Sequence, residues 1–266
     1  MLLVALLNAV LATLSPVRAE APDAYADAAR SYLVVRDDQI LWERAPALEL
    51  QPASLTKLLT ALVVLDSDWD AARWMPVSTS AATIAPTRIG LRAGEQVTAG
   101  AALGAMLIHS ANDACHVLVE SVSPDVGTFA KRMNARAGQL GMSHSKFVDP
   151  CGFDAVGQHS TVTDLLKLAQ AARRAPLIAT LTALPNAQLT TRAGRVVKFT
   201  NTNQLLGRLE GAAGMKTGYT SQAGQCLIAY ARRAEHDVWL VMLGGSQRWW
   251  QAHGMIEDAF RAPLAH

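Results

Sequence analysis

The sequence has few cysteines, few aromatic residues and almost no net charge. Of its 266 residues, 3 are cysteine and 6% are aromatic, and the formal net charge is +2. A charge this small, without any run of lysines and arginines, argues against a nucleic-acid partner. The cysteines have none of the spacings that hold zinc. The function therefore has to be inferred from other side chains.

The cysteines and histidines give little reason to expect a metal or a cofactor. Cys115, Cys151 and Cys226 can form one pair at most. Because Cys115 and Cys226 lie inside apolar runs, we expect buried free thiols. His109 and His116 are seven residues apart, which would place them on one helix face, but no third ligand accompanies them. We expect neither a metal site nor a cofactor.

Long apolar runs are also scarce. Residues 2–14 are apolar apart from Asn8 and Thr13, and the small residues Val17 and Ala19 follow. This pattern predicts a secretory signal peptide over residues 1–19, too short to span a membrane. No lysine or arginine precedes the run, so a buried N-terminal helix stays an alternative. The mature chain, 20–266, is expected to be secreted across the inner membrane to the periplasm or cell envelope, with no transmembrane span.

The mature chain, half apolar, is long enough to bury a full core. Its patterns place strands near both ends and helices between them. We predict a hairpin over 31–42 and helices over 54–65, 101–108, 113–122, 129–140, 163–172 (capped by Thr163) and 249–261. Further strands are predicted over 196–200, 214–220, 224–232 and 238–243. This order predicts an α/β (α+β) fold with one antiparallel sheet built from N- and C-terminal strands, and a helical subdomain inserted roughly at 66–190.

The segment Ser54-Leu55-Thr56-Lys57 can supply a nucleophile and its base. Residues three apart share a helix face, so the Lys57 amine can reach the Ser54 hydroxyl. The amine accepts a proton only when it is neutral, and both burial and a nearby cation such as Lys216 would lower its pKa. Taken alone, the pair would more often be a capping serine and an exposed lysine.

Two further motifs carry matching chemistry. Ser110 and Asn112 interrupt a helical pattern, where a hydroxyl can relay a proton and an amide can orient a substrate. Lys216-Thr217-Gly218 lies in an extended run and offers charge and hydroxyl to a carboxylate, with Gly218 leaving room for a ligand. A helix cap and a strand bulge are the alternatives. The three motifs together indicate an acyl-transferring serine enzyme.

The chain resembles the penicillin-recognising serine D,D-peptidases, specifically the low-molecular-mass D-alanyl-D-alanine carboxypeptidase and endopeptidase family. The likeness covers residues 32–245 and includes the flanks at 52–61, 149–153, 159–165 and 201–203. It implies a β-lactamase/D,D-peptidase-like fold. It also implies peptidoglycan stem peptides as substrates, β-lactams as covalent inhibitors, and a role in cell-wall biogenesis.

The resemblance also implies roles for the acyl-transfer residues. Ser54 would be acylated by the carbonyl of the penultimate D-alanine, with Lys57 as its base. Ser110 would pass a proton to the departing group, and Asn112 would orient the substrate.

The substrate-binding residues follow in the same way. Lys216 and Thr217 would bind the terminal carboxylate, and Arg248 would add to this recognition. The backbone N–H groups of Tyr219, directly after Gly218, and of the nucleophile would form the oxyanion hole.

The sequence also departs from the family pattern. Thr202 stands where some members carry arginine, which weakens the prediction of a carboxypeptidase, and no C-terminal β-domain is expected after the third motif. An endopeptidase that cleaves cross-links is therefore the main alternative. A β-lactamase is disfavoured because no glutamate begins a Glu-x-x-Leu-Asn loop. A non-catalytic penicillin-binding sensor is the remaining reading.

Overall fold

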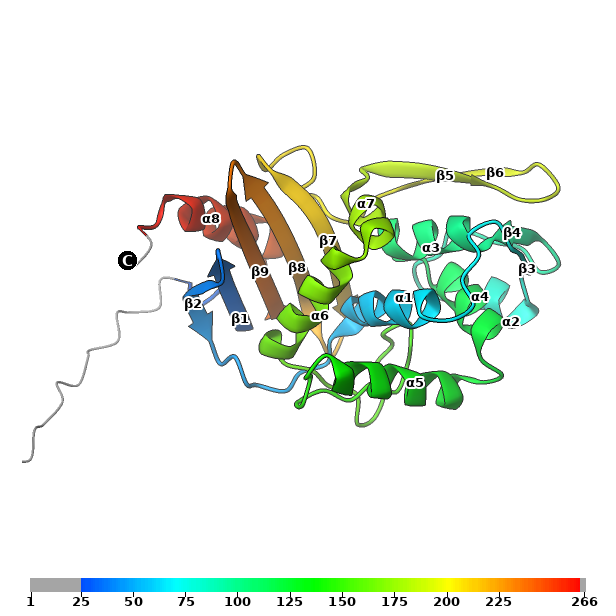
Figure 1. The fold of residues 1–266 in the computed structure, drawn as a ribbon, viewed down its shortest axis with the longest axis horizontal. Coiled ribbons are helices and arrows are strands. Elements are labelled where there is room, and N and C mark those ends of the chain that lie inside the picture. The colour runs from blue at the N-terminus through cyan, green and yellow to red at the C-terminus, as the bar shows by residue number, and fades with distance from the viewer. Residues whose placement is uncertain (1–24, 264–266) are drawn as a thin grey trace, which may run out of the picture.

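A five-stranded sheet and a layer of helices make up the computed structural model, which describes residues 25–263 (Figure 1). The predicted signal peptide over 1–19 lies outside these residues. In chain order the elements are β1 (Ala29–Arg36), β2 (Gln39–Arg44), the 3-10 helix η1 (Ala53–Thr56), α1 (Lys57–Leu65), β3 (Trp74–Pro76), α2 (Thr79–Thr83), β4 (Gln96–Thr98), α3 (Ala99–Ile108), α4 (Asn112–Val122), α5 (Val126–Gln139), α6 (Val162–Arg174), α7 (Pro176–Ala183), β5 (Asn186–Thr190), β6 (Val196–Thr200), β7 (Ala212–Thr220), β8 (Gly224–Arg233), β9 (His236–Gly245) and α8 (Arg248–Arg261).

The sheet joins the two ends of the chain, as the sequence predicts. Its strand order is β2-β1-β9-β8-β7, and every neighbouring pair is antiparallel. β1 pairs with β9 so that Tyr32 lies opposite Met242. The first and last strands in chain order, β1 and β9, are therefore neighbours inside the sheet. Strand β7 is the edge strand and lies beside the helices (Figure 1).

Both faces of the sheet are buried, because each face packs against helices. Along β1, Leu33 and Val35 belong to the core under the helical layer, whereas Tyr32 and Val34 belong to a second core under α8. Alternate residues of a strand point to opposite faces, so this run of apolar residues needs a cover on each side. The C-terminal helix α8 supplies the cover on the face opposite the other helices (Figure 1).

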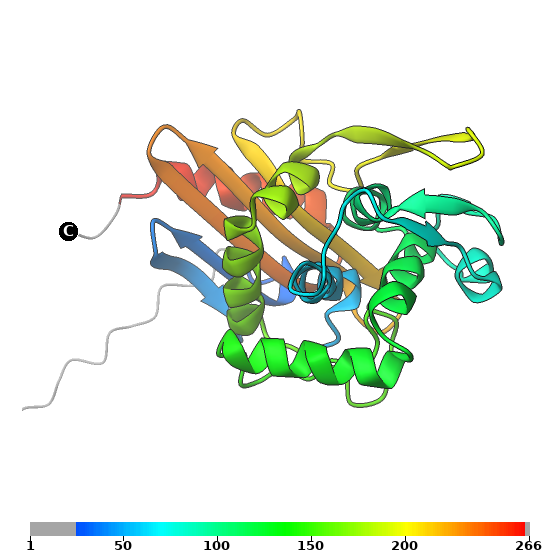
Figure 2. The same ribbon diagram turned by 45° about the vertical axis from the view of Figure 1, so that its right-hand side comes forward.

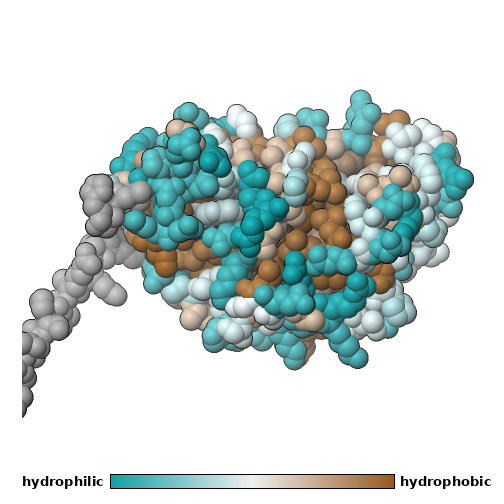
Figure 3. Space-filling model, in the orientation of Figure 1, coloured by the Kyte–Doolittle hydropathy of each residue, from teal (hydrophilic) through white to brown (hydrophobic). Residues whose placement is uncertain are grey.

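Helix α1 runs through the middle of the helical layer. It packs against α3, α4, α5 and α6, and Figure 2 shows it end-on with helices on several sides. Its sequence is apolar around most of the circumference, which suits a central helix. In the space-filling view apolar side chains gather over α1, and hydrophilic side chains cover α5 at the lower edge (Figure 3).

Some local predictions are wrong. The strand at 196–200 pairs with β5 in a separate two-stranded ribbon, not with the main sheet, and α7 was not foreseen. Helix α6 is capped by Thr161, whose hydroxyl accepts from the N–H of Asp164, whereas Thr163 donates to the carbonyl of Pro46. Within residues 25–263, no helix is both long and apolar enough to cross a membrane.

Candidate active site

Ser54 and Lys57 meet at the start of the central helix. Ser54 lies in η1, the single tight turn that leads into α1, and Lys57 is the first residue of α1. One helical turn separates them, so their side chains lie on the same side. The Lys57 Nζ is 2.9 Å from the Ser54 Oγ. Ser54 is half-buried, and Lys57 is completely buried.

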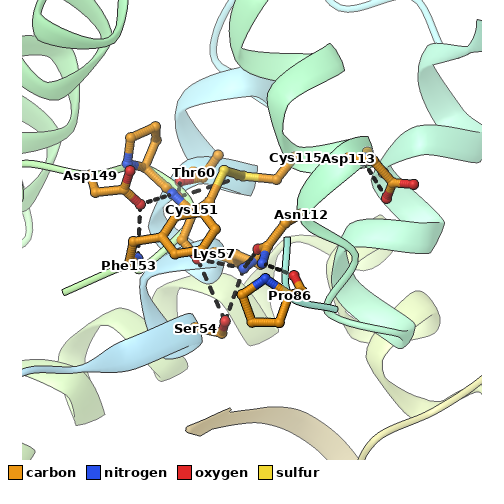
Figure 4. Close-up of a disulfide and its surroundings, with 12 residues drawn as sticks. Ser54, Lys57, Thr60, Pro86, Asn112, Asp113, Cys115, Asp149, Cys151 and Phe153 are labelled. Atoms are coloured by element: carbon orange, nitrogen blue, oxygen red, sulfur yellow. Dashed lines mark hydrogen bonds between the residues drawn. A yellow bond between two sulfur atoms is a disulfide. The ribbon is translucent and has the colours of Figure 1, made fainter. Parts of the chain in front are cut away.

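The Lys57 amine has two further acceptors, both held in fixed positions. It donates to the Oδ1 of Asn112 at 2.7 Å and to the backbone carbonyl of Cys151 (Figure 4). The amide of Asn112 cannot easily turn over, because its Nδ2 donates to the carbonyl of Pro86 at 2.6 Å. The second motif therefore meets the first at the amine.

Burial sets the protonation of this amine. It lowers the pKa of Lys57 to about 7, although the negative charge of Asp149 opposes the shift. Burial, followed by repulsion from Lys57 and Arg248, lowers the pKa of Lys216 well below its usual value. At neutral pH a large fraction of Lys57 is thus the free base that can accept a proton.

Ser110 lies in the break between α3 and α4, as the sequence predicts. Its φ of +63° falls in the left-handed region, which turns the chain sharply before Asn112 begins α4. Ser110 is buried, and its hydroxyl makes no hydrogen bond to any of the residues the structure describes. Ser110 is not among the residues that line the cavity described below.

The third motif lies on β7, the edge strand that passes beside η1. A Cβ on Gly218 would stand 2.9 Å from the Cβ of Ala53 and 3.0 Å from the backbone nitrogen of Ser54. The close contact gives Gly218 a structural role in addition to the predicted one, the approach of a ligand. The glycine lets the strand pack directly on the backbone of the nucleophile.

The polar side chains of β7 are buried beside this contact. The Thr217 hydroxyl is 2.6 Å from the hydroxyl of Thr202, in the segment between β6 and β7. The Lys216 amine donates to the backbone carbonyl of Thr217 at 2.9 Å. Thr202 also donates its N–H to the carbonyl of Ile108, which joins the third motif to the end of α3.

A cavity of about 410 Å³ opens at this meeting point. It is lined by the nucleophile, the amide of the second motif, the end of β7 and two loops: Ser54, Pro86, Thr87, Asn112, Cys151, Gly152, Phe153, Asp154, Tyr219, Thr220 and Ser221. The Tyr219 side chain is exposed at its rim. Arg248 is not among these residues, because its guanidinium donates to the backbone carbonyls of Gly218 (2.6 Å) and Cys226 (3.1 Å).

The prediction of free thiols is wrong for two of the three cysteines. Cys115 and Cys151 form a disulfide, with a Cα–Cα distance of 6.0 Å, whereas Cys226 is free and buried as expected. The 36 residues between the partners carry no local signal for pairing. Only the packing of α4 against the turn at 149–153 brings the two sulfurs together (Figure 4).

Sequence reasoning also missed the loops that hold the site. Gly152 has a φ of +84°, and a Cβ there would lie 2.1 Å from the carbonyl oxygen of Ala53. The buried carboxylate of Asp113 accepts from the N–H groups of residues 89–91, and so fixes the loop that carries Pro86. Backbone groups have no residue-type signature, so the sequence offered only the turn pattern at 149–153.

The histidines considered as ligands do not share a helix face. His109 follows the last residue of α3 and contacts the carbonyl of Thr200 at 3.0 Å, whereas His116 lies on α4. The left-handed turn at Ser110 separates the two helices, which the spacing of seven residues did not reveal. Among residues 25–263, no cluster of three or more histidine, cysteine or acidic side chains could hold a metal ion.

Comparison with known proteins gives one family. The family model described as D-alanyl-D-alanine carboxypeptidase matches residues 16–247. The chain is 29% identical to the D-alanyl-D-alanine carboxypeptidase DacF of Bacillus subtilis over 90% of its own length, but spans only 64% of that protein. It is 32% identical to a D-alanyl-D-alanine endopeptidase of Pseudomonas aeruginosa, with 77% of this chain and 67% of that protein covered.

Comparison with solved structures points to the same family. The Streptomyces K15 DD-transpeptidase superposes with a TM-score of 0.83 at 25% identity, covering 88% of this chain and 98% of that one. The fold expected from the resemblance is thereby confirmed. The chain belongs to the D-alanyl-D-alanine carboxypeptidase family of serine peptidases.

Proposed function

We propose that the protein is a serine-type D-alanyl-D-alanine carboxypeptidase that acts on peptidoglycan stem peptides through an acyl-enzyme. One observation carries the proposal: the Lys57 amine lies 2.9 Å from the Ser54 hydroxyl, and burial lowers its pKa to about 7. A hydroxyl becomes a useful nucleophile when a neutral base takes its proton.

The acceptors around Lys57 give the direction of this proton transfer. A neutral amine has two N–H groups and one lone pair. If the N–H groups donate to Asn112 and Cys151, the lone pair points to Ser54. The Ser54 oxygen then attacks the carbonyl of the penultimate D-alanine, while its proton passes to Lys57.

The remaining steps use the rim of the cavity. The developing oxyanion would accept hydrogen bonds from the backbone N–H groups of Ser54 and Tyr219. The unpartnered hydroxyl of Ser110 would relay the proton to the amine of the departing D-alanine, breaking the peptide bond. Water then attacks the ester, and the base-assisted transfer runs again to release the shortened peptide and restore the Ser54 hydroxyl.

The terminal carboxylate of the substrate would bind at β7. Lys216 supplies an amine and Thr217 a hydroxyl, and both are buried on the strand that packs on the nucleophile's turn. Arg248 would act indirectly, since its guanidinium holds the main chain at Gly218 and lies behind the strand. Its positive charge still contributes to the field at Lys216.

A second function, cleavage of peptide cross-links by an endopeptidase, is favoured by Thr202. Its hydroxyl already pairs with that of Thr217 at 2.6 Å, and it brings no cation to the carboxylate end of the cavity. A substrate whose chain continues beyond the scissile bond has less need for such a cation. The carboxypeptidase and the endopeptidase would share the same acylation chemistry.

We infer an extracytoplasmic location with β-lactams as covalent inhibitors. The predicted signal peptide over 1–19 supports export, and the disulfide suits an oxidising compartment such as the periplasm. Peptidoglycan, the substrate of this family, lies outside the inner membrane. A β-lactam would acylate Ser54 as the substrate does.

The decisive experiment uses purified mature chain and defined muropeptides. Uncross-linked pentapeptide and D,D-cross-linked dimer are incubated in parallel, and the products are identified by mass spectrometry. A carboxypeptidase releases one D-alanine from the monomer, whereas an endopeptidase converts the dimer to monomers. If neither substrate changes and a fluorescent penicillin fails to label the protein, the proposal of a serine D,D-peptidase is wrong.

A further inference from the structure

The disulfide joins the two segments that supply the fixed acceptors of the Lys57 amine. Cys115 lies one helical turn after Asn112 on α4, so both side chains leave the same face of the helix. At the other end of the bond, Cys151 itself provides the backbone carbonyl that accepts from Lys57. Figure 4 shows the bond next to Lys57, Asn112 and Ser54.

Each segment is anchored separately on its own side. The turn at 149–153 is held by Asp149, whose carboxylate accepts from the N–H groups of Cys151 and Phe153, and by Thr60 of α1, which donates to the carbonyl of Pro150. On the α4 side, the carbonyl of Pro86 fixes the amide of Asn112. In the described part of the chain, the disulfide is the covalent link between these two anchors.

We propose that the Cys115–Cys151 disulfide is a positioning element for catalysis: by holding the Asn112 amide and the Cys151 carbonyl at a fixed separation, it aims the lone pair of Lys57 at Ser54. The inference rests on the proposed function, since it concerns how the base of that reaction is oriented. Proton transfer is sensitive to alignment, and a misplacement of about 1 Å in an active site can cost about a hundredfold in rate. The two cysteines act through Lys57 and do not touch the substrate's reacting atoms.

Charged groups around Lys57 make the pH profile a specific readout. Asp149 faces it from the turn, and Lys216 faces it from β7 with Arg248 behind. Asp113 on α4 is satisfied by the backbone of another loop. None of these charges changes when the disulfide opens, so a shift of the Lys57 pKa would report how well the amine is enclosed. Burial is the largest cause of the low pKa of Lys57, so opening should move that pKa upward.

The test uses a C226A parent, which leaves only the two paired cysteines. Three forms are compared: the oxidised parent, the parent reduced with dithiothreitol and checked by thiol alkylation and mass spectrometry, and the triple variant C115A/C151A/C226A. The rate of acylation by a fluorescent penicillin is measured for each from pH 5 to pH 10. Circular dichroism and thermal melting show whether each form is folded.

We expect the oxidised parent to acylate with an acidic limb near pH 7. The reduced form and the triple variant should be at least tenfold slower at pH 7, with the limb moved to higher pH. Reoxidation should restore the reduced parent but not the triple variant. A purely structural bond would lower the melting temperature and leave the midpoint of the limb in place.

The outcomes separate the two proposals. If the oxidised parent is not labelled at all, the proposed function fails. If it is labelled normally and the folded disulfide-free forms show the same rate and the same midpoint, the positioning role is overturned. Loss of the native fold in both disulfide-free forms also overturns it, because the bond would then support the whole domain and not the base.

Discussion

The active-site cavity and a groove along α8 differ in volume and in the residues that line them. The active-site cavity measures about 410 Å³, and its lining includes the Ser54 hydroxyl, the Asn112 amide and the end of β7. A groove of about 630 Å³ lies along α8, lined by Tyr25, Gln204, Leu205, Arg208, Trp249, Trp250, Gln251, His253 and Gly254. The α8 groove is the larger of the two, and its apolar lining includes Leu205, Trp249 and Trp250. Trp250 is 80% exposed.

The difference between them is chemical. The one hydroxyl among the residues that line the α8 groove is that of Tyr25, which donates to the carboxylate of Asp258 at 2.6 Å. Burial and this carboxylate raise the pKa of Tyr25, so its hydroxyl stays protonated at neutral pH. Beside the smaller cavity, the Lys57 amine is completely buried next to the Ser54 hydroxyl, and burial lowers its pKa to about 7. A pKa that moves toward neutral pH, as at Lys57 but not at Tyr25, indicates a catalytic site better than volume does.

The sharpest way to break this comparison is to remove the nucleophile. Ser54→Ala should abolish covalent labelling by a fluorescent penicillin and abolish D-alanine release, because no other hydroxyl lies within reach of the Lys57 amine among the described residues. Labelling is read on a denaturing gel, with circular dichroism as the check on folding. Labelling that persists in a folded variant would move the nucleophile elsewhere.

The next largest effect is expected from the base. Lys57→Ala should slow acylation by about 10²- to 10⁴-fold, the usual contribution of a general base. In the unsubstituted protein, acylation should rise with pH through about 7, because the neutral amine is the active form and protonation below that pH removes it. Lys131→Ala, which removes an exposed lysine of α5, is the control. A flat profile between pH 5 and pH 9 would contradict the role of Lys57.

A smaller loss of acylation rate should follow when one methyl group is added to the edge strand β7. In Gly218→Ala, the new Cβ would meet the Cβ of Ala53 at 2.9 Å and the nitrogen of Ser54 at 3.0 Å, so the turn must shift. We expect acylation to fall about tenfold, a value on the order of what small misplacements in active sites cost. Gly138→Ala on α5 is the matched control, since nothing lies within 4 Å of its Cβ position. Equal rates in both variants would show that the turn adapts.

The α8 groove supplies the smallest expected effect. Trp250→Ala removes an exposed ring that is not part of the active-site cavity, so the acylation rate and its pH midpoint should both stay within twofold of the unsubstituted protein. The measurement is the same labelling assay. A tenfold change would mean that the cavity and the groove are coupled, and the contrast drawn between them would no longer hold.

Most of the fold was predictable because short stretches of sequence indicate which segments form helices and which form strands. The apolar run after Ser54 predicts a buried helix, and α1 is that helix. The hairpin of β8 and β9 consists of two apolar, β-rich runs around a polar turn, and their pairing follows. The strand at 196–200 was misplaced because its sequence shows that it is extended, but not which strand it pairs with.

The site was predictable in its side chains and not in its main chain. The three motifs name Ser54, Lys57 and Asn112, which the structure brings together at one amine. The carbonyl of Cys151, by contrast, could have belonged to any residue type. The contact of Gly218 with the nucleophile's turn joins two segments that are far apart in the sequence. The disulfide also joins two distant segments, so neither contact has a local sequence signal.

The order of strands has a consequence for how the protein is made. β9 lies between β1 and β8, so the N-terminal strands that lead to Ser54 share a sheet with the third motif only through the last strand of the chain. When the ribosome has synthesised only the first two hundred residues, the nascent chain contains Ser54 and Lys57 but not β7, the edge strand that lies beside them. Because such distant pairings form late in folding, a chain of that length should carry all the reactive groups of the first two motifs and still be inert.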